Sequence, residues 1–160
     1  MSSRSLERAV PAGETLLLDT SVLIAYLDGD EQTTPVAAAI IDGFIRSERN
    51  RAIASMVTVM EVLVGPARTG DRDLYATVVE FLTQLPGLRL QEVDFAIAER
   101  AATLRARYKL RAPDALILAT AEVTGVGRII SNDRAWSAMA DVTRTTTPVV
   151  LVGDHLPFAS

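Results

Sequence analysis

Two kinds of hydrophobic pattern alternate along this chain. The first is a short continuous apolar run, such as Leu16-Leu17-Leu18, which is typical of a strand covered on both faces of a sheet. Five such runs, the third with a polar interruption, predict strands at residues 16–18, 52–55, 88–93, 128–131 and 149–152.

The second pattern places apolar residues three or four positions apart, as in helices that bury one side. It predicts helices around residues 37–44, 74–85 and 97–108, and further helices after Asp19, around Glu61 and from Pro113. Because strand and helix patterns alternate, we expect an α/β fold. Its core would be a central, mainly parallel five-stranded sheet flanked by helices on both faces.

The length of 160 residues and the hydrophobic fraction of 49% suit one domain with one sizeable core. Residues 1–14 are polar and lack the apolar region of a secretory signal, so we predict a flexible N-terminal arm at 1–14 and one domain at 15–160. No apolar stretch reaches the roughly 20 residues of a membrane-spanning helix. Cysteine is absent, which excludes disulfides and thiolate chemistry. These features predict a cytoplasmic protein.

Acidic residues follow the ends of the predicted strands. Ligands of open parallel sheets bind beyond the carboxyl ends of the strands, so acids at these positions are candidates for chemistry. Asp19 follows the first strand, Glu61 lies in the first turns after the second, and Asp133 follows the fourth. Asp114 differs, because it begins a helix that comes after another helix. The chain must return to the same edge between residues 107 and 112 if Asp114 is to join the other acids.

Each acid also has a structural explanation when it is taken alone. Asp19 and Asp133 suit helix caps or turns. Glu61 completes a possible capping box that would begin at Thr58. Asp114 lies in a first helical turn, where the helix dipole stabilises a carboxylate. For Glu61 and Asp114, taken singly, the structural explanation is the stronger one.

Taken together, the four acids favour a metal site. Asp114 precedes a long apolar run and Glu61 has apolar neighbours, and carboxylates are seldom placed there unless they are paired or bind metal. A divalent cation relieves the repulsion between converging carboxylates. Oxygen ligands alone select hard cations, so we expect Mg²⁺ or Mn²⁺. The single histidine, His155, is far from the acids in sequence and is expected at the surface.

Four segments carry these acids and their neighbours: residues 17–24 (LLDTSVLI), 60–63 (MEVL), 113–121 (PDALILATA) and 130–133 (ISND). In their order and their intervals they resemble the PIN-domain ribonucleases, and particularly the VapC-type toxins of bacterial toxin–antitoxin pairs. The resemblance extends from about Leu16 to Val152. It implies a single PIN-like domain.

The resemblance further implies a metal-dependent endoribonuclease. Bound Mg²⁺ or Mn²⁺ would activate a water for in-line attack on an RNA phosphodiester, leaving a 5′-phosphate and a 3′-hydroxyl. A cognate antitoxin protein would be a partner, and a homodimer is expected. The acids implied as catalytic and metal-binding are Asp19, Glu61, Asp114 and Asp133. The hydroxyl residues expected to support them are Thr20, Ser21 and Ser131.

Two other functions stay open at this point. The first is a catalytically silent PIN-like module whose acidic pocket binds basic residues of a partner, and the complete set of four acids argues against it. The second is an aspartyl-phosphate phosphatase, because Asp19 follows a hydrophobic strand. Such enzymes have an acid two positions later, where this chain has Ser21. The net charge of −4 argues mildly against binding nucleic acid through overall charge, but it leaves room for a local arginine-lined groove.

Overall fold

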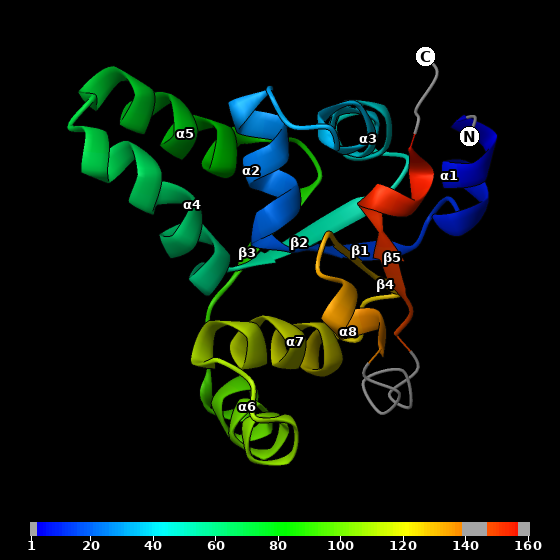
Figure 1. Cartoon of the computed structure of the whole chain (residues 1–160), viewed down its shortest axis with the longest axis vertical. Helices are drawn as coiled ribbons and strands as arrows, with labels where there is room; N and C mark the ends of the chain where they lie inside the picture. Colours follow the sequence, from blue (N-terminus) through cyan, green and yellow to red (C-terminus); the bar gives the residue numbers. More distant parts are fainter. Residues whose placement is uncertain (1–2, 139–146, 157–160) are drawn as a thin grey trace.

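The computed structural model describes residues 3–138 and 147–156 of the chain. At its centre lies one sheet of five parallel strands in the order β3-β2-β1-β4-β5 (Figure 1). The expected α/β fold with five strands is confirmed, and every pairing between neighbouring strands is parallel. The strands are β1 (Thr15–Leu18), β2 (Arg51–Ser55), β3 (Leu88–Gln91), β4 (Arg128–Ser131) and β5 (Val149–Leu151).

Helices connect the strands. The α-helices are α1 (Ser3–Ala9), α2 (Thr20–Asp28), α3 (Thr34–Ala38), α4 (Met56–Thr69), α5 (Arg72–Gln84), α6 (Phe95–Tyr108), α7 (Ala112–Thr124) and α8 (Arg134–Ala138). A π-helix, η1 (Ala39–Ile45), continues α3, and a 3-10 helix, η2 (Val152–His155), follows β5. Within residues 3–138 and 147–156, no helix combines the length and the apolar character needed to cross a membrane.

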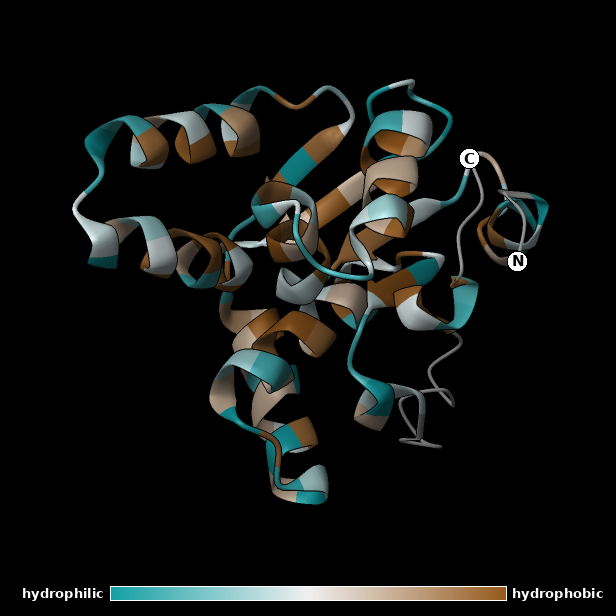
Figure 2. Cartoon of the chain, turned by 45° about the horizontal axis from the view of Figure 1, so that its top comes forward, coloured by the Kyte–Doolittle hydropathy of each residue, from teal (hydrophilic) through white to brown (hydrophobic). Residues whose placement is uncertain are grey.

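The helices form a layer on each face of the sheet. Leu16 and Leu18 of β1 pack into a core with α1 to α5 and η1, whereas Leu17 faces the other way, into a core with α6, α7 and Trp136 of α8. Figure 1 shows the two layers, and Figure 2 shows hydrophobic residues along the strands and on the helix sides that face them. β1, at the centre of the sheet, is therefore buried on both faces, as its continuous apolar run predicts.

The N-terminal segment differs from our expectation of a flexible arm at residues 1–14. Residues 3–9 form helix α1, and Leu6 and Val10 are 1% and 0% exposed in the core on that side of the sheet. Leu6 lies in α1, and Val10 directly follows the helix, with its backbone N–H bonded to the Leu6 carbonyl at 2.9 Å. The burial of both side chains removes apolar surface from water and fixes α1 to the domain.

His155 also differs from expectation. We expected a surface residue, but His155 is buried at 8% exposure, and its Nδ1 lies 3.4 Å from the Ser5 hydroxyl of α1. Burial lowers the pKa of the His155 imidazole, and the nearby charge of Asp154 opposes that shift. His155 therefore belongs to the contact between the two ends of the described chain.

The chain reverses direction between α6 and α7, just before Asp114. Residues 109–111 join α6 to α7, and Lys109 adopts a left-handed conformation with φ 55°. The helices pack against each other in opposite directions, with Arg100 of α6 paired with Glu122 of α7. The last turn of α6 thus lies beside the first turn of α7, and no extended link is needed.

Candidate active site

Asp19 lies directly after β1, at the carboxyl end of the sheet, and it is 6% exposed. One carboxylate oxygen accepts a hydrogen bond from the backbone N–H of Thr20 at 2.7 Å. The other accepts hydrogen bonds from the hydroxyls of Ser21 and Ser131, each at 2.8 Å. The strand exit positions Asp19, and the two serines fix the orientation of its carboxylate.

These donors do not fully compensate the negative charge. Burial raises the pKa of the Asp19 carboxyl above its ordinary value, the hydrogen bonds from Ser21, Ser131 and Thr20 lower it in part, and the charge of Glu61 raises it further. The net direction is upward. The environment of the ionised carboxylate therefore lacks positive charge, which a bound cation would supply.

Glu61 is connected to Asp19 through Thr20. The Thr20 hydroxyl donates a hydrogen bond to Glu61 Oε2 at 2.5 Å, and it lies 3.4 Å from the hydroxyl of Thr58. Thr58 was not among the expected supporting residues, and its full burial, at 0% exposure, was not evident from the sequence. The backbone N–H of Thr20 thus binds one acid while its side chain binds the next.

The capping box expected at Thr58 does not form. Helix α4 begins earlier, at Met56, and its cap is Ser55, whose hydroxyl accepts a hydrogen bond from the backbone N–H of Val57. Glu61 consequently lies beyond the first turn of α4. Its carboxylate has no capping role and contacts the Thr20 hydroxyl instead.

Asp133 follows β4 and caps the short helix α8. Its carboxylate accepts a hydrogen bond from the backbone N–H of Ala135 at 2.8 Å. Its own backbone N–H donates to the Ser131 hydroxyl at 3.0 Å, and that of Asn132 donates to the Ser21 hydroxyl at 3.1 Å. Because both serines also bind Asp19, the exits of β1 and β4 form one hydrogen-bonded unit.

Asp114 lies in the first turn of α7 and pairs with Arg111. The Nε of Arg111 lies 2.9 Å from Asp114 Oδ2, and its Nη2 lies 3.4 Å from Oδ1, so the guanidinium binds both carboxylate oxygens. The hydrogen bond to Asp114 raises the pKa of Arg111, and the charges of Asp114, Glu61 and Asp133 add to this shift. Arg111 therefore contacts Asp114 directly and is affected by the charges of Glu61 and Asp133.

Arg111 is a further site residue that sequence reasoning missed. It occupies the N-cap of α7, where its side chain makes no cap hydrogen bond. Ser, Thr, Asp and Asn are preferred at this position, and the positive end of the helix dipole disfavours a cation there. An arginine directly before Ala112-Pro113 was the signal available in the sequence.

The donors fit a divalent cation in kind, because they are carboxylate and hydroxyl oxygens, which hard cations prefer. They are not arranged as a finished cage. Among residues 3–138 and 147–156, no three Asp, Glu, His or Cys side chains stand close enough together to hold a metal ion. Asp19 is connected to Glu61 through Thr20 and to Asp133 through Ser131, whereas Asp114 is bound to Arg111.

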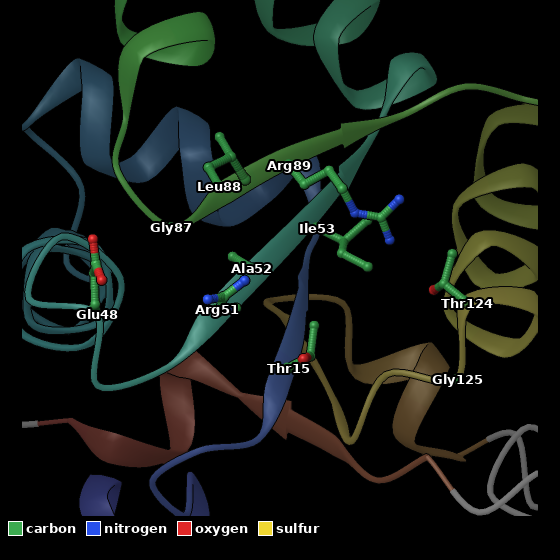
Figure 3. Close-up of a pocket in the computed structure, with 10 residues that line it drawn as sticks. All are labelled: Thr15, Glu48, Arg51, Ala52, Ile53, Gly87, Leu88, Arg89, Thr124 and Gly125. Atoms are coloured by element: carbon green, nitrogen blue, oxygen red, sulfur yellow. The ribbon is translucent and has the colours of Figure 1, made fainter.

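A separate pocket of about 500 Å³ lies at the opposite end of the sheet. It is lined by the starts of β1, β2 and β3 and by the end of α7 (Figure 3). Its charged residues are Arg51, Arg89 and Glu48, and it contains none of the candidate acids. The candidate active site is thus defined by its side chains and not by this cavity.

A match to a protein family model covers the segments that carry the four acids. A family model described as "PIN domain" matches residues 16–142, a span that includes all four acids. A comparison with curated protein sequences gives no match. The family assignment therefore comes from the family model.

Solved structures with a similar fold come from toxin–antitoxin systems. A chain of a toxin–antitoxin complex from Klebsiella pneumoniae is 25% identical, with a TM-score of 0.61 over 86% of this chain and 97% of that chain. VapBC-5 from Mycobacterium tuberculosis, described as a member of the VapBC toxin–antitoxin family, is 24% identical, with a TM-score of 0.57 over 86% and 98% of the chains. VapC20 from the same organism, described as a sarcin–ricin loop cleaving toxin, is 16% identical, with a TM-score of 0.64 over 77% and 93%.

Proposed function

The chain belongs to the PIN domain family, and from this premise we propose that it is an Mg²⁺- or Mn²⁺-dependent endoribonuclease. The observation that carries the proposal is Asp19. It is a buried carboxylate at the exit of the central strand, held by two serine hydroxyls, with its pKa raised and with Glu61 nearby. A divalent cation bound beside such a buried carboxylate would compensate its negative charge, so Asp19 is the favoured position for the metal.

Each acid has a separate part in the proposed reaction. Asp19 and Asp114 would hold the cation directly, and Glu61 and Asp133 would complete its shell directly or through water. When bound, the cation lowers the pKa of a water and neutralises charge on the phosphate oxygens. The products would carry a 5′-phosphate and a 3′-hydroxyl.

The hydroxyl residues keep the acids in place for this chemistry. Ser21 and Ser131 hold one oxygen of Asp19, which leaves the cation a fixed ligand. The Thr20 hydroxyl positions Glu61 by donating a hydrogen bond to its carboxylate at 2.5 Å. Because these donors come from the exit of β1 and the end of β4, the geometry of the site depends on the central strands and not on a loose loop.

We propose that the chain is the toxin of a toxin–antitoxin pair, with RNA as substrate, a cognate antitoxin as partner and a homodimer as its assembly. The antitoxin partner is supported by the fold similarity to a chain of the toxin–antitoxin complex from Klebsiella pneumoniae, because the matched region covers most of both chains. An apolar stripe on α4 supports a protein contact: Met56, Met60 and Val64 follow one another every four residues and are 42%, 52% and 36% exposed.

The test is cleavage of RNA by the purified chain after any bound partner has been removed by unfolding and refolding. With Mn²⁺, the wild type should cleave single-stranded or structured RNA, and a chelator should stop the reaction. Glu61→Gln and Asp133→Asn should each lower the rate by about 100-fold or more. Glu80→Gln, which removes an exposed acid of α5, should leave the rate unchanged.

Two results would contradict the nuclease. Hydrolysis of small phosphate monoesters, with beryllium fluoride bound at Asp19, would identify an aspartyl-phosphate phosphatase instead. A refolded, Mn²⁺-loaded wild type that leaves a broad panel of RNAs intact, but binds a basic peptide, would identify a silent binding module.

A further inference from the structure

Arg111 is placed where it costs α7 stability. It stands at the N-cap, and its side chain does not satisfy any of the free N–H groups of the first turn. The positive end of the helix dipole also disfavours its charge. The pair with Asp114 is three residues apart and the Arg111 side chain is 77% exposed, so this ion pair contributes little stability. Helix stability therefore does not explain the arginine.

The negative charges that act on Arg111 come from three segments of the chain. Asp114 of α7 binds the guanidinium directly, and the charges of Glu61 in α4 and of Asp133 after β4 also raise the pKa of Arg111. These are three of the four acids to which we assign the metal. The guanidinium therefore lies where it partly neutralises the acidic site when no divalent cation is bound.

We propose that Arg111 is an internal counter-ion that competes with the divalent cation for Asp114 and, once displaced, binds a phosphate of the RNA beside the metal. The proposal rests on the function proposed above. It accounts for the lack of a finished metal cage among the described residues, because Asp114 cannot bind the guanidinium with both oxygens and a metal ion at the same time. Opening the Arg111–Asp114 pair would free one acid and one cation in a single movement.

The chemistry of the guanidinium suits the second role. Its planar fork binds two oxygens of a phosphate as it binds the two oxygens of Asp114. Its exposure leaves it accessible to a strand of RNA, and its fixed position before Pro113 keeps it near the acids. Arg111 would thus supply a positive contact for RNA in a chain whose net charge is −4.

The first arm of the test measures metal binding without RNA. The full chain is titrated with Mn²⁺ in an isothermal calorimeter. Arg111→Ala should bind Mn²⁺ about 3- to 5-fold more tightly than the wild type, because the guanidinium that competes for Asp114 is gone. Lys109→Gln is the matched control. It removes a positive charge two residues away that makes no ion pair with an acid among the described residues, and it should change the affinity by less than twofold.

The second arm measures RNA cleavage at saturating Mn²⁺. Arg111→Ala should raise KM for RNA by about tenfold while kcat changes by less than threefold, because a phosphate contact is lost and the metal site is full. Arg111→Lys keeps the charge without the fork and should restore part of the loss in KM. Lys109→Gln should leave KM within twofold of the wild type.

The outcomes separate this inference from the proposed function. If the wild type binds no Mn²⁺ and cleaves no RNA, the proposed function fails. If the wild type binds and cleaves, but Arg111→Ala binds Mn²⁺ no more tightly or has a KM no higher than Lys109→Gln, the role of Arg111 is overturned. Opposite effects of one substitution on the two affinities would support it.

Discussion

The carboxylate of Asp19 accepts three hydrogen bonds and still resists ionisation, because burial outweighs its donors. Sequence reasoning found this residue, since an acid directly after a buried apolar strand is visible in the order of residues. It did not find Arg111. The pairing of Arg111 with Asp114, and the effect of the charges of Glu61 and Asp133 on the pKa of Arg111, depend on how α4, α7 and the turn after β4 are arranged in space.

Asp19→Asn should stabilise the metal-free protein. The folded-state pKa of Asp19 is raised, so the ionised form at neutral pH costs stability that is regained only when the carboxyl is protonated at low pH. Asparagine removes that charge and can still cap α2. We expect the midpoint of thermal unfolding in a chelator at pH 7 to rise by a few degrees.

The same variant should lose the stabilisation that Mn²⁺ gives the wild type, because a ligand is gone. Differential scanning calorimetry with and without Mn²⁺ measures both effects. A clear fall in the melting temperature of metal-free Asp19→Asn would show that the three hydrogen bonds, and not the charge, decide the stability of this residue.

His155 gives the fold a separate dependence on pH. Its folded-state pKa lies below the ordinary 6.5, so its contribution is complete above about pH 6.5 and is lost as the pH falls through the folded-state pKa. The wild type should therefore lose melting temperature faster than His155→Gln between pH 7 and pH 5.5. Since Asp19 is common to both proteins, the difference between the two curves isolates the histidine. If the melting temperatures of the two proteins fall in parallel with pH, the pKa of His155 is not lowered by folding, which would contradict this prediction.

At the scale of elements, the apolar pattern predicted all five strands. Strands β1, β2, β4 and β5 are mostly buried, whereas β3 is only partly buried and includes the polar residues Arg89 and Gln91. Asp71 and Asp94 cap α5 and α6, and their carboxylates accept hydrogen bonds from the backbone N–H groups of Leu74 and Ile97. Helix α1 was not predicted. Its signal consists mainly of Leu6 and Val10, and a pattern of two apolar residues in a polar segment is too short to distinguish a packed helix from an arm.

Leu6→Ala tests whether α1 is part of the domain. Leu6 is 1% exposed, so its truncation should lower the free energy of unfolding by about 2–4 kcal/mol, as for other leucines in packed cores. Glu7→Ala, at the exposed neighbouring position, should change it by less than about 0.5 kcal/mol. Urea unfolding followed by circular dichroism gives both values. Equal stability of the two variants would restore the description of residues 1–14 as an arm.

At the scale of the molecule, the acids gather because parallel strands end at one edge of the sheet. From the sequence alone, that rule places Asp19, Glu61 and Asp133 in one region. It was not sufficient to predict their spacing. Their connections depend on individual side chains: Thr20 lies between Asp19 and Glu61, and Arg111 binds Asp114.

The central claim is that these acids form one divalent-cation site. The most direct measurement is diffraction from crystals of the chain soaked in Mn²⁺, with the anomalous signal of manganese locating the ion. We predict a manganese peak bound to the Asp19 carboxylate, with Asp114 turned from Arg111 toward the ion and the other two acids within direct or water-bridged reach. Manganese found only elsewhere, for example in the pocket at the opposite end of the sheet, with Arg111 still paired to Asp114, would contradict the account.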